Sequence, residues 1–444
     1  MAVNTQQRMR LPALQLPSRL RGWRLPAPIP LAEAQRPLPW RWLWLQALSI
    51  WFASRAAFAV LTLYYPLVSY PKLLKIKTVP LASIIQRWTS WDGSIYIHTA
   101  QSGYTPEFSV FFPLYPALIR TCAFIIGPHW ATAALLVSNL GALLAYGGIA
   151  ALAAQFAATA NSRQIVRTTL ILFAVYPLGF FTAAAYTDGI FVGLAAFALL
   201  FAVRRRWWWA AAFALLAGWT RPVGPALILP LAWEAFQCYR AARAEGGEER
   251  GVEGREKAGA EEGGAKSARQ ALRATAPALA AICAPILSVI TFSIYLWQRF
   301  GDPLIMIHSE QIWAHFHLSP LFSIPVAIFA FAHVANNSPL QFRVLLDLAP
   351  VIGALIITLV AARRAPLVLT LYMLGLLYIV TSEPIDYTDL FISSGRYMIA
   401  AIPVVLYLAN WLRRADWLLP TLCICGVALQ AVLTIFFLSQ GWIV

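Results

Sequence analysis

Long apolar runs divide this chain of 444 residues, and each is close to the roughly 20 residues that an α-helix needs to cross a bilayer. Apolar residues make up 60% of the sequence and charged residues only 12%, whereas a soluble domain is about 25% charged. A backbone surrounded by lipid must satisfy its hydrogen bonds internally, which a helix does within one segment. The sequence therefore predicts an all-α polytopic membrane protein.

We expect about 11 transmembrane helices from these runs. The predicted spans are residues 42–66, 131–157, 167–185, 187–203, 207–220, 222–237, 274–297, 344–362, 365–381, 396–412 and 416–438. Two further apolar stretches, 108–127 and 320–335, each contain two prolines. Because broken segments of this kind need not cross the membrane, we predict that both are interfacial or re-entrant.

The spans and the charged segments divide the chain into four parts. These are a basic, Pro- and Arg-rich cytoplasmic tail (1–41), an N-terminal transmembrane module (42–239), a flexible charged cytoplasmic loop (240–273) and a C-terminal transmembrane module (274–444). The N-terminal module contains the first extracytoplasmic loop, at about 67–130, where we expect interfacial or re-entrant helices. Basic residues flank the apolar runs, and by the positive-inside rule they predict a multi-pass protein of the plasma (inner) membrane with a cytoplasmic N-terminus.

The flanking basic residues account for the net charge of +15. No basic stripe with interleaved aromatic residues is present in the sequence to bind nucleic acid. Cys423 and Cys425 are separated by one residue, which is not a zinc or redox spacing. Glu310, His315 and His317 also lack a standard ligand spacing. We therefore predict no metal site, no cofactor and no nucleic-acid partner, and we expect the lipid bilayer to surround the chain.

Polar residues that do not flank spans gather on the predicted outer face. They include Asp92, Asp188 in a Tyr-Thr-Asp turn, Arg221, and residues of the loops 298–319 and 382–396. Polar groups at membrane depth are costly, so they are candidates for function. For Asp188 a simple turn-forming role is an equal alternative.

Asp92 follows Trp88 and Trp91, which are typical of an aromatic belt at the membrane interface. If a helix begins at Asp92, the carboxylate is an N-cap and Tyr96 lies one turn above it. Alternatively, Asp92 is a general base whose aromatic surroundings exclude water. The sequence leaves both interpretations open.

Transfer of a sugar from a lipid-phosphate donor would need one or two cations to hold the leaving phosphate. Arg396 and Arg221 are the candidates. Each has an alternative role, either as an interfacial arginine whose charged end reaches water or as the partner of a nearby acid. The acids considered are Glu383, Asp386 and Asp389.

Residues 91–116, WDGSIYIHTAQSGYTPEFSVFFPLYP, resemble the signature of the PIG-V family, which comprises mannosyltransferases like GPI mannosyltransferase II. That signature is a Trp-Asp pair, a short helix, Ala-x-x-Gly-Tyr, an acid and Phe-Phe-Pro-x-x-Pro. The matching residues are Trp91, Asp92, Ala100, Gly103, Tyr104, Glu107, Phe111, Phe112, Pro113 and Pro116. Four further stretches of this chain also resemble the family and follow one another in the same order as in the family. They are residues 176–191, 215–227, 300–313 and 393–403.

The resemblance implies a GT-C-type fold, found in a class of integral-membrane glycosyltransferases, with the N-terminal module as the catalytic part. It implies a polyprenyl-phosphate mannose donor, inversion at the sugar carbon, and an acceptor hydroxyl on a lipid, a glycan or a protein. Asp92 would be the general base on the extracytoplasmic face. The donor phosphate and substrate would be bound by Arg396, Arg221, Asp188, Tyr186, Gln311 and Trp313. The sugar or acceptor pocket would contain Trp91, Tyr96, Tyr104, Glu107 and His98.

Two other classes of function remain as alternatives. A transporter or flippase of lipid-linked glycans would place ionisable groups near the membrane midplane within repeated halves, and the sequence shows no internal repeat. A non-catalytic partner in glycan assembly would not need Asp92 at all. The gathering of polar groups on one face favours the enzyme.

Overall fold

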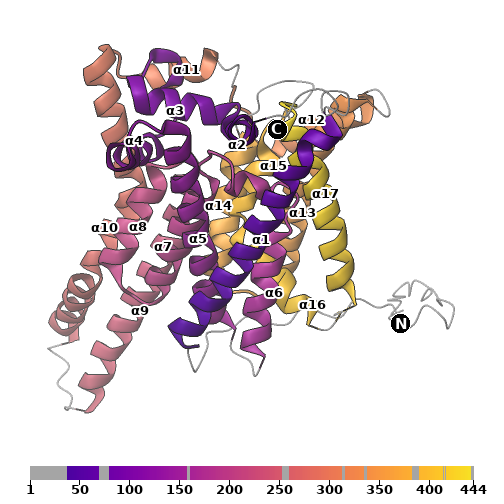
Figure 1. Ribbon diagram of the computed structural model, residues 1–444. Coiled ribbons are helices and arrows are strands. Elements are labelled where there is room, and N and C mark those ends of the chain that lie inside the picture. Colours follow the sequence, from indigo (N-terminus) through magenta and orange to yellow (C-terminus); the bar gives the residue numbers. More distant parts are fainter. Residues whose placement is uncertain are drawn as a thin grey trace, which may run out of the picture.

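A computed structural model describes residues 38–69, 80–157, 161–252, 260–312, 316–334, 338–382, 390–413, 415 and 417–441. The part of the chain described here is built from α-helices joined by short 3-10 turns (Figure 1). The longest helices that are apolar enough to cross a membrane are α1 (Trp40–Ser69), α5 (Trp130–Phe156), α10 (Ala260–Phe300), α13 (Pro339–Ala361) and α17 (Leu418–Leu438).

Within the described residues, five helices are thus long and apolar enough to be spans, and a bent pair raises the number to six. The pair consists of the one-turn helix α15 (Ser394–Tyr397) with the 3-10 turn η8 (Met398–Ala400), followed by α16 (Ile402–Leu412) after a bend of 68°. These helices fit a multi-pass membrane protein. The prediction of about 11 spans counted shorter helices as well.

The shorter apolar helices are α4 (Leu114–Ile126), α7 (Asp188–Val203), α8 (Trp207–Gly218), α12 (Pro320–His333) and α14 (Leu367–Ser382). Two of them, α4 and α12, are the segments predicted to be interfacial or re-entrant. The remaining elements are α2 (Leu81–Gln86), η3 (Arg87–Thr89), α3 (Asp92–Ser102), η4 (Pro106–Phe108), α6 (Ser162–Ala174), η5 (Gly179–Thr182), η6 (Gly224–Leu227), α9 (Ile228–Val252) and α11 (Ile305–Ile312).

Two predictions about these segments are wrong. The predicted span 167–185 is not one helix, because α6 ends at Ala174 and the chain then turns through η5. Pro177 explains the break, since proline disfavours a helical conformation for the residue before it. Most of the predicted flexible loop 240–273 is helical, because α9 runs to Val252 and α10 begins at Ala260. Its Ala, Glu, Lys and Arg residues are strong helix formers even without an apolar face.

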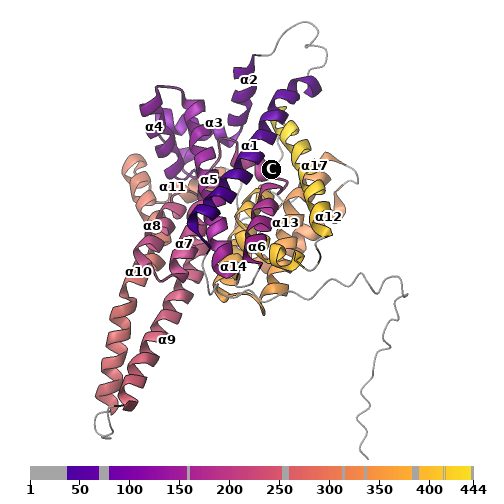
Figure 2. The same cartoon turned by 60° about the horizontal axis from the view of Figure 1, so that its bottom comes forward.

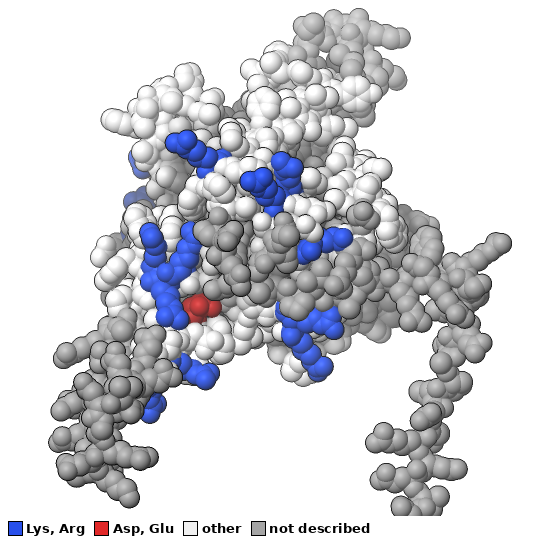
Figure 3. Space-filling model, turned by 90° about the horizontal axis from the view of Figure 1, so that it is seen from below, with Lys and Arg blue, Asp and Glu red and all other residues white. Residues whose placement is uncertain are grey.

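The two ends of the helical bundle differ in their structure and charge. Helices α2, α3, α4 and α11 lie together at the upper end in Figure 1, whereas α9 and α10 project from the lower end (Figures 1 and 2). Seen from below, the lower face shows mostly basic charged side chains among the described residues (Figure 3). Two arginines bind glutamines of neighbouring helices: Arg167 Nε donates to Gln46 Oε1 over 2.8 Å, and Arg204 Nε donates to Gln155 Oε1 over 2.9 Å.

Small residues let α5 and α7 approach closely. A Cβ added to Gly189 would lie 2.8 Å from the backbone nitrogen of Ala142, and one added to Gly193 would lie 2.8 Å from that of Ala145. Close backbone approach through small residues is typical of helices packed within a membrane. The contact fixes the position of Asp188, which begins α7.

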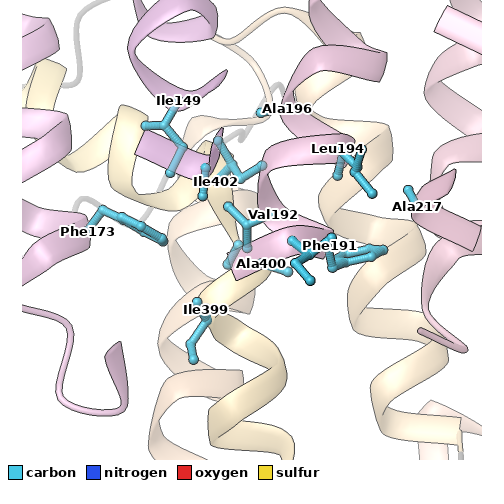
Figure 4. Packing of buried hydrophobic residues seen from close by; sticks show 14 of the residues in the cluster. Ile149, Phe173, Phe191, Val192, Leu194, Ala196, Ala217, Ile399, Ala400 and Ile402 are labelled. Atoms are coloured by element: carbon cyan, nitrogen blue, oxygen red, sulfur yellow. The ribbon is translucent and has the colours of Figure 1, made fainter. Parts of the chain in front are cut away.

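Helix α7 also packs against the bent segment near the C-terminus. Figure 4 shows Val192 of α7 beside Ala400 of η8 and Ile402 of α16, with Ile149 of α5 close by. All four side chains are buried in one apolar cluster. This packing connects the first turns of α7 to the segment that carries Arg396.

The positive-inside rule predicts that the basic lower end faces the cytoplasm and that α3 faces outward. In a variant whose native cysteines are replaced, we expect Ser94→Cys to react with a membrane-impermeant maleimide added to intact cells. Arg206→Cys should react only after the cells are permeabilised, because Arg206 follows Arg204 at the basic end. The reverse labelling pattern would invert the proposed orientation.

Candidate functional site

Four charged residues meet below α3, although they are far apart in the sequence. Arg396 Nη1 donates to Asp92 Oδ2 over 2.7 Å. Arg221 Nη1 donates to Asp188 Oδ1 and forms the second ion pair. Electrostatic interactions join the pairs, since Arg396 is close enough to be stabilised by the charges of both Asp92 and Asp188. The sequence-predicted residues Asp92, Arg396, Asp188 and Arg221 therefore form one cluster.

Asp92 is held by a strained turn at the start of α3. Trp91 has a φ of 59°, in a region that residues other than glycine rarely adopt. The turn is attached to the segment before α7, because Ala185 N donates to the carbonyl of Trp88 over 2.9 Å. A Cβ on Gly93 would lie 3.2 Å from Ala185, so a side chain after Asp92 would require Ala185 to shift by a few tenths of an ångström. Packing of this kind can maintain a strained backbone at a functional site.

The simple helix-cap interpretation of Asp92 is wrong. Trp91 occupies the N-cap position, Asp92 is the first helical residue, and no side-chain capping hydrogen bond is present at this helix end. The Asp92 carboxylate instead contacts Arg396 and remains 29% exposed, whereas the Arg396 side chain is 11% exposed. A carboxylate that is accessible and lies beside a buried cation can take part in proton transfer next to an anion.

Arg396 is surrounded by aromatic rings. Its guanidinium carbon lies 5.1 Å from the ring centre of Tyr186 and 5.5 Å from that of Phe181. The buried Tyr186 is oriented by its hydroxyl, which donates to the carbonyl of Ser90 over 3.3 Å. The Nε atom of Arg396 is buried and has no hydrogen-bond partner in the described part of the chain. Arg396 therefore keeps a donor besides the one that binds Asp92.

The Asp188–Arg221 pair is more deeply buried, with side-chain exposures of 1% and 4%. Arg221 also lies over the ring of Tyr397, 4.2 Å from its centre. Asp188 is at the N-terminus of α7, where the helix dipole favours a negative charge. The structure thus supports an ion-pair role for Arg221, with Asp188 as its partner. The partners considered from the sequence, Glu383, Asp386 and Asp389, lie outside the described residues.

Tyr96 is buried in α3, one helical turn after Asp92. Its ring packs edge-on against Tyr115 and Phe111, with centroid distances of 5.0 and 5.1 Å. Burial raises the pKa of the Tyr96 hydroxyl well above its usual value, and the negative charge of Asp92 adds to the effect. Tyr96 is therefore a neutral hydrogen-bond donor and not a base.

Three residues predicted for the sugar or acceptor pocket contact residues outside the charged cluster. Tyr104 donates through its hydroxyl to the carbonyl of Phe111 over 2.8 Å. His98 packs against the ring of Phe108, at 5.9 Å between centroids. Glu107 is exposed on η4. Their place in one pocket with Asp92 stays a prediction.

Of the remaining predicted residues, Trp91 lies next to Asp92 and is exposed. Gln311 belongs to α11, of which only the backbone is described at this position. Trp313 lies outside the described residues. The predicted roles of Gln311 and Trp313 in substrate binding therefore stay predictions.

An apolar groove of about 430 Å³ lies between α3, α4 and α10. Its lining includes Thr99, whose hydroxyl is buried with no hydrogen-bond partner in the described chain, and the exposed Arg120 of α4. Trp219 forms one wall and is oriented by an indole hydrogen bond of 3.0 Å to Thr291 Oγ1. Trp219 precedes Arg221 by two residues, so the backbone connects this wall of the groove to the charged cluster.

Asp347 was missed by sequence reasoning. It lies within α13, is completely buried, and accepts a hydrogen bond of 2.9 Å from the backbone nitrogen of Gly395. The sequence did contain a signal, because an acid inside a predicted transmembrane span is a functional candidate. Its partner was not visible from the sequence.

Among the described residues, no group of three or more His, Cys, Asp and Glu side chains is placed to hold a metal ion. The chain matches no protein-family model, no curated protein and no solved structure. The relationship to the PIG-V family therefore stays a prediction that rests on the sequence stretches named above.

Proposed function

We propose that the protein is a membrane glycosyltransferase with a GT-C-type fold. It moves a sugar, mannose by the resemblance, from a polyprenyl-phosphate donor to a hydroxyl of a lipid, glycan or protein acceptor on the extracytoplasmic face. The observation that carries the proposal is the Asp92–Arg396 pair, which sets an accessible carboxylate beside a cation with a spare donor.

In the proposed reaction, Asp92 accepts the proton of the acceptor hydroxyl as its oxygen attacks the anomeric carbon. The bond between that carbon and the donor phosphate oxygen breaks, the configuration inverts, and the lipid phosphate leaves with the bonding electrons. A positioned base typically accelerates such a step by about 10²- to 10⁴-fold. A guanidinium placed at the developing negative charge stabilises the transition state.

In the proposed site, Arg396 would serve both reactants. One of its Nη atoms holds Asp92, while its Nε atom has no partner in the described chain. Because the guanidinium is planar and rigid, a phosphate oxygen bound at a second edge would be kept at a set distance from Asp92. Arg396 would then align the base with the leaving group.

The groove beside the cluster supports a lipid-linked donor. Its lining is mainly apolar and lies between the α4 and α10 helices, so that an isoprenoid chain has a place next to the charged site. Trp219, which forms one wall of the groove, precedes Arg221 by two residues in the chain.

The transporter alternative draws on one observation, which is the buried acid Asp347 within α13. In a transporter we would expect such an acid to bind a coupling ion or substrate. Its hydrogen bond to the Gly395 backbone favours a fixed structural partner instead. The enzyme therefore remains the better-supported function.

The proposal is tested with purified protein in lipid nanodiscs and a membrane glycolipid extract as acceptor. We expect transfer of radiolabel from polyprenyl-phosphate mannose, none from GDP-mannose, and the same rate with EDTA present. Loss of transfer with EDTA and recovery with magnesium or manganese would contradict the metal-independent mechanism. If no sugar is transferred but proteoliposomes translocate a lipid-linked glycan, the transporter alternative replaces the enzyme.

A further inference from the structure

Both backbone groups of Gly395, the residue before Arg396, are bound by side chains from other parts of the chain. Its nitrogen donates to Asp347 Oδ1 over 2.9 Å. Its carbonyl accepts a hydrogen bond of 2.6 Å from the hydroxyl of Tyr176. Asp347 belongs to α13 and Tyr176 follows α6, so two separate segments hold one peptide between them.

The fit around this peptide leaves no room for a larger residue. A Cβ on Gly395 would lie 2.4 Å from the carbonyl oxygen of Leu346 and 2.8 Å from Leu178 Cδ1. Contacts below 3.0 Å with backbone cannot be relieved by a side-chain rotation. Gly395 is therefore required by close packing, independently of its hydrogen bonds.

The segment that carries Arg396 has little stability of its own. Helix α15 contains only one turn, from Ser394 to Tyr397, and so short a helix is unstable in isolation. It begins after Ser393, whose φ of 67° is unfavourable for a residue other than glycine. The bend of 68° before α16 also separates it from the longer helix that follows. Its orientation must come from contacts with neighbouring segments.

We propose that Asp347 and Tyr176 clamp the Gly395 backbone and thereby orient Arg396 toward Asp92. Both are positioning residues, because each binds the backbone of Gly395 and acts on Arg396 through it. The consequence for catalysis rests on the proposed function, whereas the clamp itself does not. In an enzyme of this kind, a displacement of about 1 Å can lower the rate by about 10²-fold.

If the clamp exists, two substitutions of Asp347 should have different effects on sugar transfer. Asp347→Asn keeps an oxygen that accepts from Gly395, so we expect transfer within a few-fold of the wild type. Asp347→Leu removes the acceptor, and kcat should fall by about 10²-fold while the KM for the acceptor changes little. Thr358→Val is the matched control, because Thr358 is also buried in α13 and its hydroxyl has no hydrogen-bond partner in the described chain. The control should keep the wild-type rate.

Hydrogen–deuterium exchange of the peptide that contains Gly395 provides a readout independent of sugar transfer. We expect faster exchange in Asp347→Leu and wild-type exchange in Asp347→Asn and Thr358→Val. If the wild type transfers no sugar but this pattern is seen, the proposed function fails and the clamp stands. Unchanged exchange in Asp347→Leu, or equal effects of the Asn and Leu variants, would overturn the clamp.

Tyr176→Phe tests the same inference should Asp347→Leu not fold. It removes only the hydroxyl that donates to Gly395, and faster exchange of the Gly395 peptide with a lower kcat is expected. Wild-type exchange and kcat in this variant would overturn the role of Tyr176 in the clamp.

Discussion

Replacing Asp92 by asparagine is expected to lower the rate of sugar transfer by about 10²- to 10⁴-fold, the usual contribution of a general base. Asparagine has the same size and still offers Arg396 an acceptor oxygen, but it cannot take the acceptor's proton at neutral pH. The rate is measured under single-turnover conditions with polyprenyl-phosphate mannose. Binding of the donor should change much less than the rate.

Asp302→Asn is the matched control for this experiment. Asp302 is a partly exposed carboxylate that precedes α11, and its Oδ1 accepts from Leu304 N over 2.9 Å. Asparagine can accept the same backbone hydrogen bond in this turn, so the control should transfer sugar at the wild-type rate. If Asp92→Asn also transfers sugar at the wild-type rate, Asp92 has only a structural role at the start of α3 and the general-base mechanism is wrong.

The second large expected effect is a loss of stability when the buried Asp188–Arg221 pair is broken. We expect Asp188→Asn or Arg221→Gln to lower the free energy of unfolding by about 3–5 kcal/mol, because each leaves an unpaired charge in the interior. The side chains are almost fully buried, so solvent screens the pair little. Unfolding by denaturant in mixed micelles measures the change.

The double variant separates a lost pair from a general packing defect. With both charges removed, we expect a loss smaller than the sum of the single losses, since the residues are directly coupled. Arg206→Gln is the control, because Arg206 is exposed and surface substitutions change stability by about 0.5 kcal/mol or less. Additive losses in the double variant, or single losses no larger than the control, would contradict a stabilising pair.

The sequence by itself determined the membrane class and most of the helices. The apolar runs at 42–66, 131–157 and 344–362 correspond to α1, α5 and α13, because hydrogen bonding within a helix and the length of an apolar run are local properties. The same reasoning failed at 167–185, where average hydrophobicity concealed the break at Pro177. Local composition also hid the helices that extend into 240–273.

The sequence also identified four polar residues in apolar surroundings, which are Asp92, Asp188, Arg221 and Arg396. It did not show which acid pairs with which arginine. Asp92 and Arg396 are 304 positions apart, and Asp188 and Arg221 are 33 apart. Ion pairing depends on distances across the fold, which no spacing in the chain reveals.

Only the tertiary structure decided how Arg396 is held. The acid inside α13 could be seen in the sequence, but its bond to the Gly395 backbone depends on how α13 packs beside α15. A one-turn helix has no stable orientation of its own, so neighbouring segments must supply it. Helices formed where local hydrogen bonds were sufficient, and the site formed where packing brought distant charges into contact.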